Sequence, residues 1–229
     1  MQIIVLGMHR SGTSAVARLL NMMGAYFAPE RMELPINQAN PKGYWERRDV
    51  VNLNEDILKS LNISWDRLAE FTPKTINSDI IQRFQPHVAE IVLGLDAQRP
   101  WMVKDPRLCL LLPLWMPLLE VPVSIIVYRS PIQVAQSLAK RENFSLRLGM
   151  ALWEKYNLCA LENSNHLQRI LISYEELMQH PIATVKKLHE QLQQFEVQGL
   201  RVPSEKEIRT FLEPTLFHAQ VMTVCKMPM

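Results

Sequence analysis

Residues 1–20 read MQIIVLGMHRSGTSAVARLL, a short apolar run that leads into a loop framed by two glycines and then into a helix. Residues 2–6 predict a buried parallel strand, and residues 14–23 carry apolar side chains at helical spacing. Gly7 and Gly12 permit the tight backbone between them. Such a loop directs backbone N–H groups and the positive end of a helix dipole at one point, which predicts a binding place for phosphate or sulfate.

The frame G-x-x-x-x-G also begins the P-loop of nucleotide triphosphatases. Here, however, Thr13 stands where that loop has the lysine that contacts the β- and γ-phosphates. Arg10 supplies a cation earlier in the loop, with a planar fork of donors suited to an anion. The pattern favours an anion site over the alternative, a purely structural turn that uses glycine.

Length and composition indicate one globular domain over residues 1–229, because 48% hydrophobic residues suffice for one substantial core. The formal net charge of +2 argues against a protein that binds nucleic acid electrostatically. Cys109, Cys159 and Cys225 are too few and too scattered for a disulfide framework or a structural zinc site, so we expect reduced thiols.

The sequence contains no apolar stretch of the roughly 20 residues that a membrane-spanning helix needs. The first predicted strand begins within two residues of Met1, which leaves no room for a signal peptide. We therefore expect a cytoplasmic protein without a membrane span.

Strands and helices alternate along the chain. Residues 101–104, 124–128 and 170–174 predict further short buried strands, each near a helical pattern. This alternation predicts an α/β fold, a three-layer α/β/α sandwich around a central parallel sheet. Ligands of such sheets bind at the carboxyl ends of the strands. A loop at 26–44, rich in proline and asparagine, is expected over the site, and the helices around 50–81 are expected to line an acceptor site.

Polar side chains follow two of these strands. Lys104 comes directly after an apolar strand, in the segment VKDPR. Arg129 follows the next strand, and Ser137 lies eight positions later on a helix that begins at Pro131. That spacing brings a guanidinium and a hydroxyl to one anion if the helix folds back beside the strand end.

Three segments together resemble a known family. GMHRSGTS at 7–14, YRSPIQVAQS at 128–137 and SYEELMQHP at 173–181 are similar to the sulfotransferases that use 3′-phosphoadenosine 5′-phosphosulfate (PAPS), whose fold is of the P-loop type. The resemblance covers most of the chain, to about residue 194. It implies transfer of a sulfuryl group from PAPS to a hydroxyl or amine acceptor, with release of adenosine 3′,5′-bisphosphate. No acidic cluster with metal-ligand spacing is present in the sequence, and no metal requirement is predicted.

The resemblance also implies which residues hold the donor. The 5′-phosphosulfate would bind at the first loop, at Arg10, Ser11, Gly12, Thr13 and Ser14. Arg129 and Ser137 match the pair that holds the 3′-phosphate. Tyr174 matches a tyrosine that lies by the adenine, with core packing as the alternative. A donor with a phosphosulfate and a separate 3′-phosphate needs two anion pockets, and the sequence offers two.

The general base is not the histidine of the small-molecule sulfotransferases, because Pro106 occupies its place in the Lys-Thr-His segment. The Lys-Asp-Pro form resembles instead the branch that modifies proteins and glycans and uses a glutamate base early in the chain. Glu46, at the predicted start of an amphipathic helix, is the first choice, and Glu33 is the second. The alternative for Glu46 is stabilisation of a helix N-terminus. Lys104 and Arg10 are the predicted catalytic cations.

Two other functions stay open. A P-loop kinase of nucleotides or metabolites is disfavoured by Thr13 at the lysine position. A non-catalytic nucleotide-binding interaction protein would keep the pocket without turnover. The sequence leaves open which acceptor is used and which oligomeric state the protein adopts.

Overall fold

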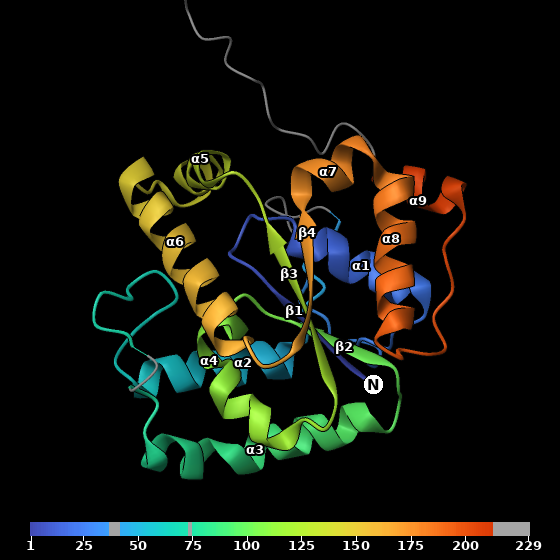
Figure 1. Ribbon diagram of the computed structural model, residues 1–229. Coiled ribbons are helices and arrows are strands. Elements are labelled where there is room, and N and C mark those ends of the chain that lie inside the picture. Colours follow the sequence, from blue (N-terminus) through green and yellow to red (C-terminus); the bar gives the residue numbers. More distant parts are fainter. Residues whose placement is uncertain (37–41, 73–74, 213–229) are drawn as a thin grey trace, which may run out of the picture.

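The first strand, β1, lies inside a four-stranded sheet in the computed structural model, with the order β2-β1-β3-β4 and every pair parallel (Figure 1). The strands are β1 (Gln2–Leu6), β2 (Trp101–Lys104), β3 (Pro122–Tyr128) and β4 (Gln168–Ser173). The structure describes residues 1–36, 42–72 and 75–212. The sheet and its order confirm the predicted single-domain α/β fold with a central parallel sheet.

Helices cover both faces of this sheet, which confirms the predicted three layers (Figure 1). One layer contains α2 (Arg48–Ser60), α3 (Ser78–Asp96), α4 (Leu108–Trp115), the short 3-10 helix η2 (Met116–Leu118), α5 (Pro131–Glu142) and α6 (Leu146–Asn163). The other contains α1 (Thr13–Met23), α7 (Tyr174–Gln179), α8 (Pro181–Gln194) and α9 (Glu205–Phe211). Within the described ranges, no helix combines the length and the apolar character needed to cross a membrane.

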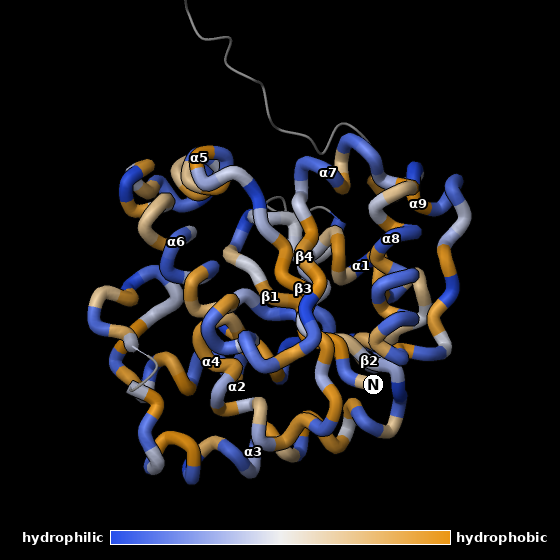
Figure 2. The backbone as a smooth tube through the Cα atoms, viewed as in Figure 1, coloured by the Kyte–Doolittle hydropathy of each residue, from blue (hydrophilic) through white to orange (hydrophobic). Residues whose placement is uncertain are grey.

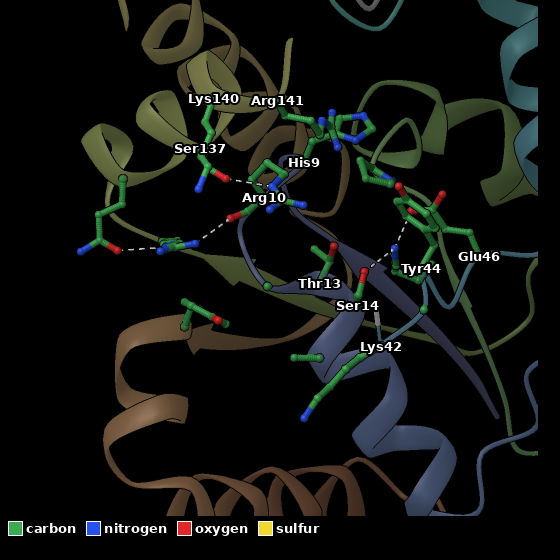
Figure 3. A pocket seen from close by; sticks show the side chains of 18 of the residues that line it. His9, Arg10, Thr13, Ser14, Lys42, Tyr44, Glu46, Ser137, Lys140 and Arg141 are labelled. Atoms are coloured by element: carbon green, nitrogen blue, oxygen red, sulfur yellow. Dashed lines mark hydrogen bonds and ion pairs between the residues drawn. The ribbon is translucent and has the colours of Figure 1, made fainter. Parts of the chain in front are cut away.

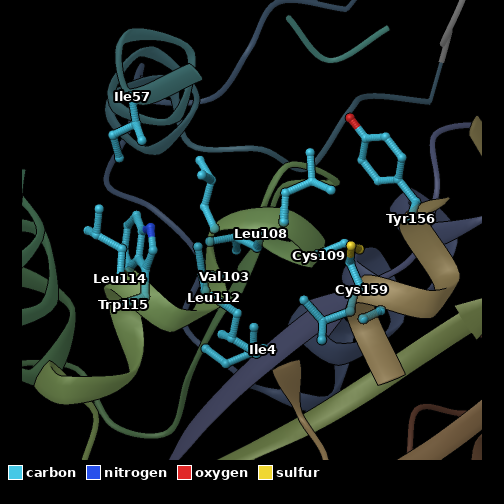
Figure 4. Close-up of a cluster of buried hydrophobic side chains, with 14 of the residues drawn as sticks. Ile4, Ile57, Val103, Leu108, Cys109, Leu112, Leu114, Trp115, Tyr156 and Cys159 are labelled. Carbon is cyan, nitrogen blue, oxygen red and sulfur yellow. The ribbon is translucent and has the colours of Figure 1, made fainter. Parts of the chain in front are cut away.

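Strands β1, β2 and β3 each contribute side chains to the hydrophobic clusters on both faces of the sheet, because successive side chains of a strand point to opposite faces. Ile4 and Leu6 of β1 pack into the cluster under α2, α3, α4 and α6, whereas Ile3 and Val5 pack into the cluster under α1 and α8. Figure 4 shows part of the first cluster, which contains Ile4 of β1 and Trp115 of α4. The strands form the hydrophobic centre of the molecule in Figure 2. A sheet buried on both faces accounts for strands that read as continuous apolar runs.

Several element boundaries differ from the predicted ones. β3 begins at Pro122, because its pairing with β1 starts at Gln2 opposite Pro122. β4 runs over Gln168–Ser173, and its first two residues are exposed and polar, so an apolar pattern cannot reveal them. Glu46 was expected at a helix start, but α2 begins at Arg48 and Glu46 lies in the loop before it.

Gly7 occupies the turn from β1 into the loop, and its surroundings exclude a side chain. Its φ is 144°, and a Cβ built there would lie 2.3 Å from the carbonyl oxygen of Val127. Gly7→Ala must therefore move β3 or strain the turn, and we expect it to lower the free energy of unfolding by about 2–4 kcal/mol. Denaturant unfolding of Gly7→Ala measures this loss, and Gly94→Ala serves as the control.

Gly94 is the matched control, because it lies inside α3 with no atom within 4 Å of a built Cβ. Gly94→Ala should raise stability by about 0.5–1 kcal/mol through helix propensity. Equal effects of the two substitutions would contradict the assignment of Gly7 as a packing-restricted turn.

Candidate active site

The described residues enclose a cavity of about 720 Å³ at the carboxyl edge of the sheet (Figure 3). The predicted site residues that line it are Arg10, Gly12, Thr13, Ser14, Glu46, Lys104, Arg129, Ser137 and Tyr174. Apart from Glu46, which lies in the loop before α2, they come from the ends of β1, β2, β3 and β4 and from the segments that follow, as expected for a parallel sheet. Ser11 and Glu33 do not line the cavity.

The loop between β1 and α1 wraps tightly at the floor of the cavity. Arg10 has a φ of 70°, and Gly12, the N-cap of α1, has a φ of 92°. Gly12 has no room for a side chain, because a built Cβ would lie 2.1 Å from the ring of Tyr174. Ser11 is fully buried, and its N–H donates to the carbonyl of Met8 at 3.1 Å. The N-terminus of α1 therefore opens into the cavity beside Arg10.

Arg10 joins the loop to the segment that follows β3. Its Nε donates to Ser137 Oγ at 2.9 Å, and its carbonyl accepts from Arg129 Nη1 at 3.3 Å. The guanidinium of Arg129 lies 4.7 Å from the ring centre of Tyr174. Helix α5 therefore folds back beside the end of β3, as predicted. Arg10 lies between Arg129 and Ser137, the two residues that were expected to share an anion.

Several positively charged side chains lie close to Arg10. Burial lowers the pKa of Arg10, and repulsion from Arg141 and Arg129 lowers it further. Burial likewise lowers the pKa of Arg129. Guanidinium groups that repel each other in a partly dry cavity gain from an anion bound between them. This electrostatic arrangement, together with the N-terminus of α1, favours a ligand with more than one anionic group.

Lys104 and Glu46 form a buried ion pair on another side of the cavity, with Lys104 Nζ 2.5 Å from Glu46 Oε1. Lys104 is 1% exposed and Glu46 is 6% exposed, so both charges are largely removed from water. Burial raises the pKa of Glu46, although Lys104 opposes the rise. Lys104 also donates to Ser14 Oγ at 3.2 Å. A carboxylate of raised pKa beside a cation is a suitable proton acceptor.

The sequence profile described as the sulfotransferase family matches residues 2–195. The chain belongs to the sulfotransferase family. The matched range contains every residue that lines the cavity except Phe211. No curated protein sequence matches the chain.

Solved structures of sulfotransferases share this fold. The sulfotransferase domain of the Synechococcus PCC 7002 olefin synthase superposes with a TM-score of 0.53 at 20% identity, over 84% of this chain and 73% of that one. The sulfotransferase domain of the curacin biosynthetic pathway gives 0.52 at 18% identity, over 91% and 76%. Sulfotransferase STF9 from Mycobacterium avium gives 0.53 at 14% identity, over 96% and 68%.

The two candidate bases of this sulfotransferase lie in different surroundings. Glu46 points into the cavity, whereas Glu33 is exposed and its backbone pairs with that of Arg47. In the predicted loop at 26–44, residues 42–44 line the cavity, and residues 37–41 lie outside the described residues. The helices around 50–81 were expected to line an acceptor site, but no described residue of that range lines the cavity.

The turn after β2 is held by a buried polar network. Asp105 is fully buried and accepts hydrogen bonds from Arg107 Nη1 at 2.8 Å and from Asn54 Nδ2 at 2.8 Å. Arg107 also pairs with Glu55, and Asn54 accepts from the indole of Trp115. This network fixes the position of Lys104 at the end of β2. The described part of the sulfotransferase has no cluster of three or more His, Cys, Asp or Glu side chains suited to a metal ion.

Sequence reasoning assigned no binding role to four His, Lys or Arg residues that line the cavity of this sulfotransferase. They are His9, Lys42, Lys140 and Arg141. Helical spacing could have revealed Lys140 and Arg141, because they follow Ser137 by three and four positions and share its helix face. The placement of Lys42 depends on a contact with Phe211, 169 residues away, which no local pattern reveals.

Proposed function

We propose that the protein transfers a sulfuryl group from PAPS to a hydroxyl or amine acceptor and releases adenosine 3′,5′-bisphosphate. The observation that carries the proposal is the pair of cationic ends in one cavity, joined through Arg10. At one end lie the N-terminus of α1 and the Lys104 ammonium, and at the other lie Arg129 and Ser137. A donor with two separate anionic groups matches this arrangement.

Donor binding in this proposal divides between the two ends. The backbone of residues 10–14 and the hydroxyls of Thr13 and Ser14 would bind the phosphosulfate, aided by the dipole of α1. Ser11 would contribute through the loop backbone alone, because its side chain is buried behind the loop. Arg129 and Ser137 would bind the 3′-phosphate, and the Tyr174 ring beside Arg129 would border the adenine.

The chemistry requires a base, in-line positioning and cations at the leaving group. Glu46 would accept the proton of the acceptor hydroxyl as the acceptor oxygen bonds to sulfur and the bond from sulfur to the 5′-phosphate oxygen breaks. The negative charge left on the 5′-phosphate would be stabilised by Lys104 and Arg10. Little covalent participation by the protein is needed, in analogy with phosphoryl transfer.

A thermal-unfolding comparison tests the donor class, because a ligand that binds only the folded state raises its stability. We expect adenosine 3′,5′-bisphosphate at about 100 times its Kd to stabilise the fold by about 2.7 kcal/mol, and AMP at the same concentration to stabilise it much less. Arg129→Met should remove most of this difference between the two nucleotides, because it removes a 3′-phosphate contact. Stabilisation by ATP with magnesium but not by the bisphosphate would contradict the proposal and indicate a kinase.

The state of the thiols is consistent with a reducing compartment. Cys109 and Cys159 are free and buried, and Cys225 lies outside the described residues. Free buried cysteines are typical of cytosolic proteins. We propose that the reaction takes place in the cytoplasm.

A further inference from the structure

More cationic side chains line the cavity than the proposed function assigns to the donor. Among the described residues that line it, six side chains are cationic, and Glu46 is the single carboxylate. Three of the six cations serve the donor in the proposal above. Of the others, Lys42 donates a hydrogen bond to the carbonyl of Phe211 at 2.7 Å. Lys140 and Arg141 remain without a role in binding the donor.

These two residues lie together in the last turn of α5. They follow Ser137 by one helical turn, so all three side chains lie on the helix face that borders the cavity. Figure 3 shows Lys140 beyond Ser137 and shows Arg141 directed toward His9. The cationic surface therefore continues past the predicted 3′-phosphate site.

An aromatic ring outside the cavity lining packs against two residues of this part of the lining, Arg141 and His9. The Arg141 guanidinium lies 5.7 Å from the ring centre of Trp65, and the His9 ring lies 4.6 Å from that ring. A ring that packs under a guanidinium holds it in one orientation. We call His9, Trp65, Lys140 and Arg141 the cationic corner.

His9 adds an unused hydrogen-bonding group to the cationic corner. Its Nε2 is buried and has no hydrogen-bond partner within the part of the chain that the structure describes. Burial, followed by repulsion from Arg107, Arg141, Lys104 and Arg10, keeps its pKa well below the usual 6.5. The imidazole is therefore neutral at pH 7 and can donate one hydrogen bond. A buried polar atom without a partner is costly, and a bound ligand can supply that partner.

The charge of the cationic corner is only partly balanced by the protein. Arg141 Nε lies 2.5 Å from Glu142 Oε1, but Glu142 does not line the cavity. Lys140 makes no ion pair with any residue that the structure describes. Lys104 and Glu46 line the same cavity as His9, Lys140 and Arg141, so an acceptor in this cavity can reach both the corner and the Lys104–Glu46 pair.

We propose that the cationic corner binds an anionic group of the acceptor, which is therefore a hydroxyl or amine compound that also carries a carboxylate, phosphate or sulfate. This inference rests on the proposed function, because it assigns the other cations to the donor. Arg141 and Lys140 bind the anion, His9 donates a hydrogen bond to it, and the acceptor's hydroxyl or amine lies toward Glu46. The cationic corner selects anionic acceptors over neutral ones of the same size.

Calorimetric titration tests this with inorganic phosphate as the probe, added to protein saturated with adenosine 3′,5′-bisphosphate. The bisphosphate fills both donor phosphate positions, so we expect phosphate to bind at the cationic corner. Arg141→Met keeps an apolar stem against Trp65 and should weaken phosphate binding about tenfold or more, and Lys140→Met should weaken it less. Acetate is titrated in the same way. Tighter binding of acetate than of phosphate would indicate an acceptor with a carboxylate, and tighter binding of phosphate would indicate a phosphorylated acceptor.

Two further variants locate the bound anion. Arg147→Met removes an exposed cation of α6 that does not line the cavity, and it should leave phosphate affinity unchanged. Lys104→Met tests whether phosphate binds instead at the position of the sulfuryl group, which the bisphosphate leaves empty. Phosphate binding lost in Lys104→Met but retained in Arg141→Met would overturn the proposal, as would equal binding by Arg141→Met and the wild type or no phosphate binding at all. Failure of the bisphosphate itself to bind the wild type would instead overturn the proposed function.

Discussion

Glu46→Gln is expected to lower the rate of sulfuryl transfer by about 10²- to 10⁴-fold, the contribution of a positioned general base. Glutamine keeps the volume of the side chain and can still accept a hydrogen bond from Lys104, whose Nζ lies 2.5 Å from Glu46 Oε1. Because the buried Lys104 ammonium loses its countercharge, the variant should also lose stability, by up to about 3–5 kcal/mol, and its rate is compared under conditions where nucleotide binding shows that it is folded. Release of adenosine 3′,5′-bisphosphate from PAPS, measured with a panel of hydroxyl and amine acceptors, provides the readout.

The matched control is Glu33→Gln, because Glu33 is exposed and lies outside the cavity lining. Its rate should stay within about twofold of the wild type, as for surface substitutions in general. The pH dependence gives a second readout. Because burial raises the pKa of Glu46 above 4.5, kcat/KM should fall on acidification through a limb above pH 4.5, and this limb should be missing in Glu46→Gln. Loss of activity in Glu33→Gln with normal activity in Glu46→Gln would refute the assignment.

Lys104→Met should reduce the rate about 10²- to 10³-fold, since it removes a cation where charge develops on the leaving phosphate. It should also destabilise the fold by about 3–5 kcal/mol, because Glu46 loses its partner in a site where it is 6% exposed. Chemical denaturation measures the second effect, and single-turnover release of the bisphosphate measures the first.

Lys59→Met and a double variant separate the two effects. Lys59 pairs with Asp56 at 3.1 Å with both side chains mostly exposed, so its removal should cost less than about 1 kcal/mol and leave the rate unchanged. The double variant Lys104→Met/Glu46→Gln should recover much of the stability lost in Lys104→Met, because neither position then holds an unpaired buried charge, without recovering turnover. Recovery of turnover in the double variant would show that Lys104 acts only by pairing with Glu46.

The prediction of the fold succeeded where patterns are local. Strand β1, the glycine loop and helix α1 are contiguous in sequence, and each has its own periodicity or backbone signal. The polar start of β4 was missed because an edge strand can expose such residues. The start of α2 was placed too early, and the approach of Glu46 to Lys104 bridges 58 positions that no local pattern connects.

The lining of the cavity was predicted where the sequence motifs are continuous, and less well where the cavity is assembled from distant segments. Arg129 and Ser137 were found because a strand end and a helix face bring them together. Lys42 and His9 were not, because their places depend on Phe211 and Trp65, far along the chain. Ser11 belongs to the motif, yet its side chain turns into the interior.

The bonds that Arg10 makes predict how fragments of the proposed donor bind. Its side chain donates a hydrogen bond to Ser137 and its carbonyl accepts one from Arg129, so one residue belongs to both of the proposed donor-binding ends. A phosphate that orders Arg10 from either end prepares the other end for its own phosphate. The affinities of two fragments, each with a single phosphate, therefore should not add up to the affinity of the intact nucleotide, and the difference is the coupling free energy carried by Arg10.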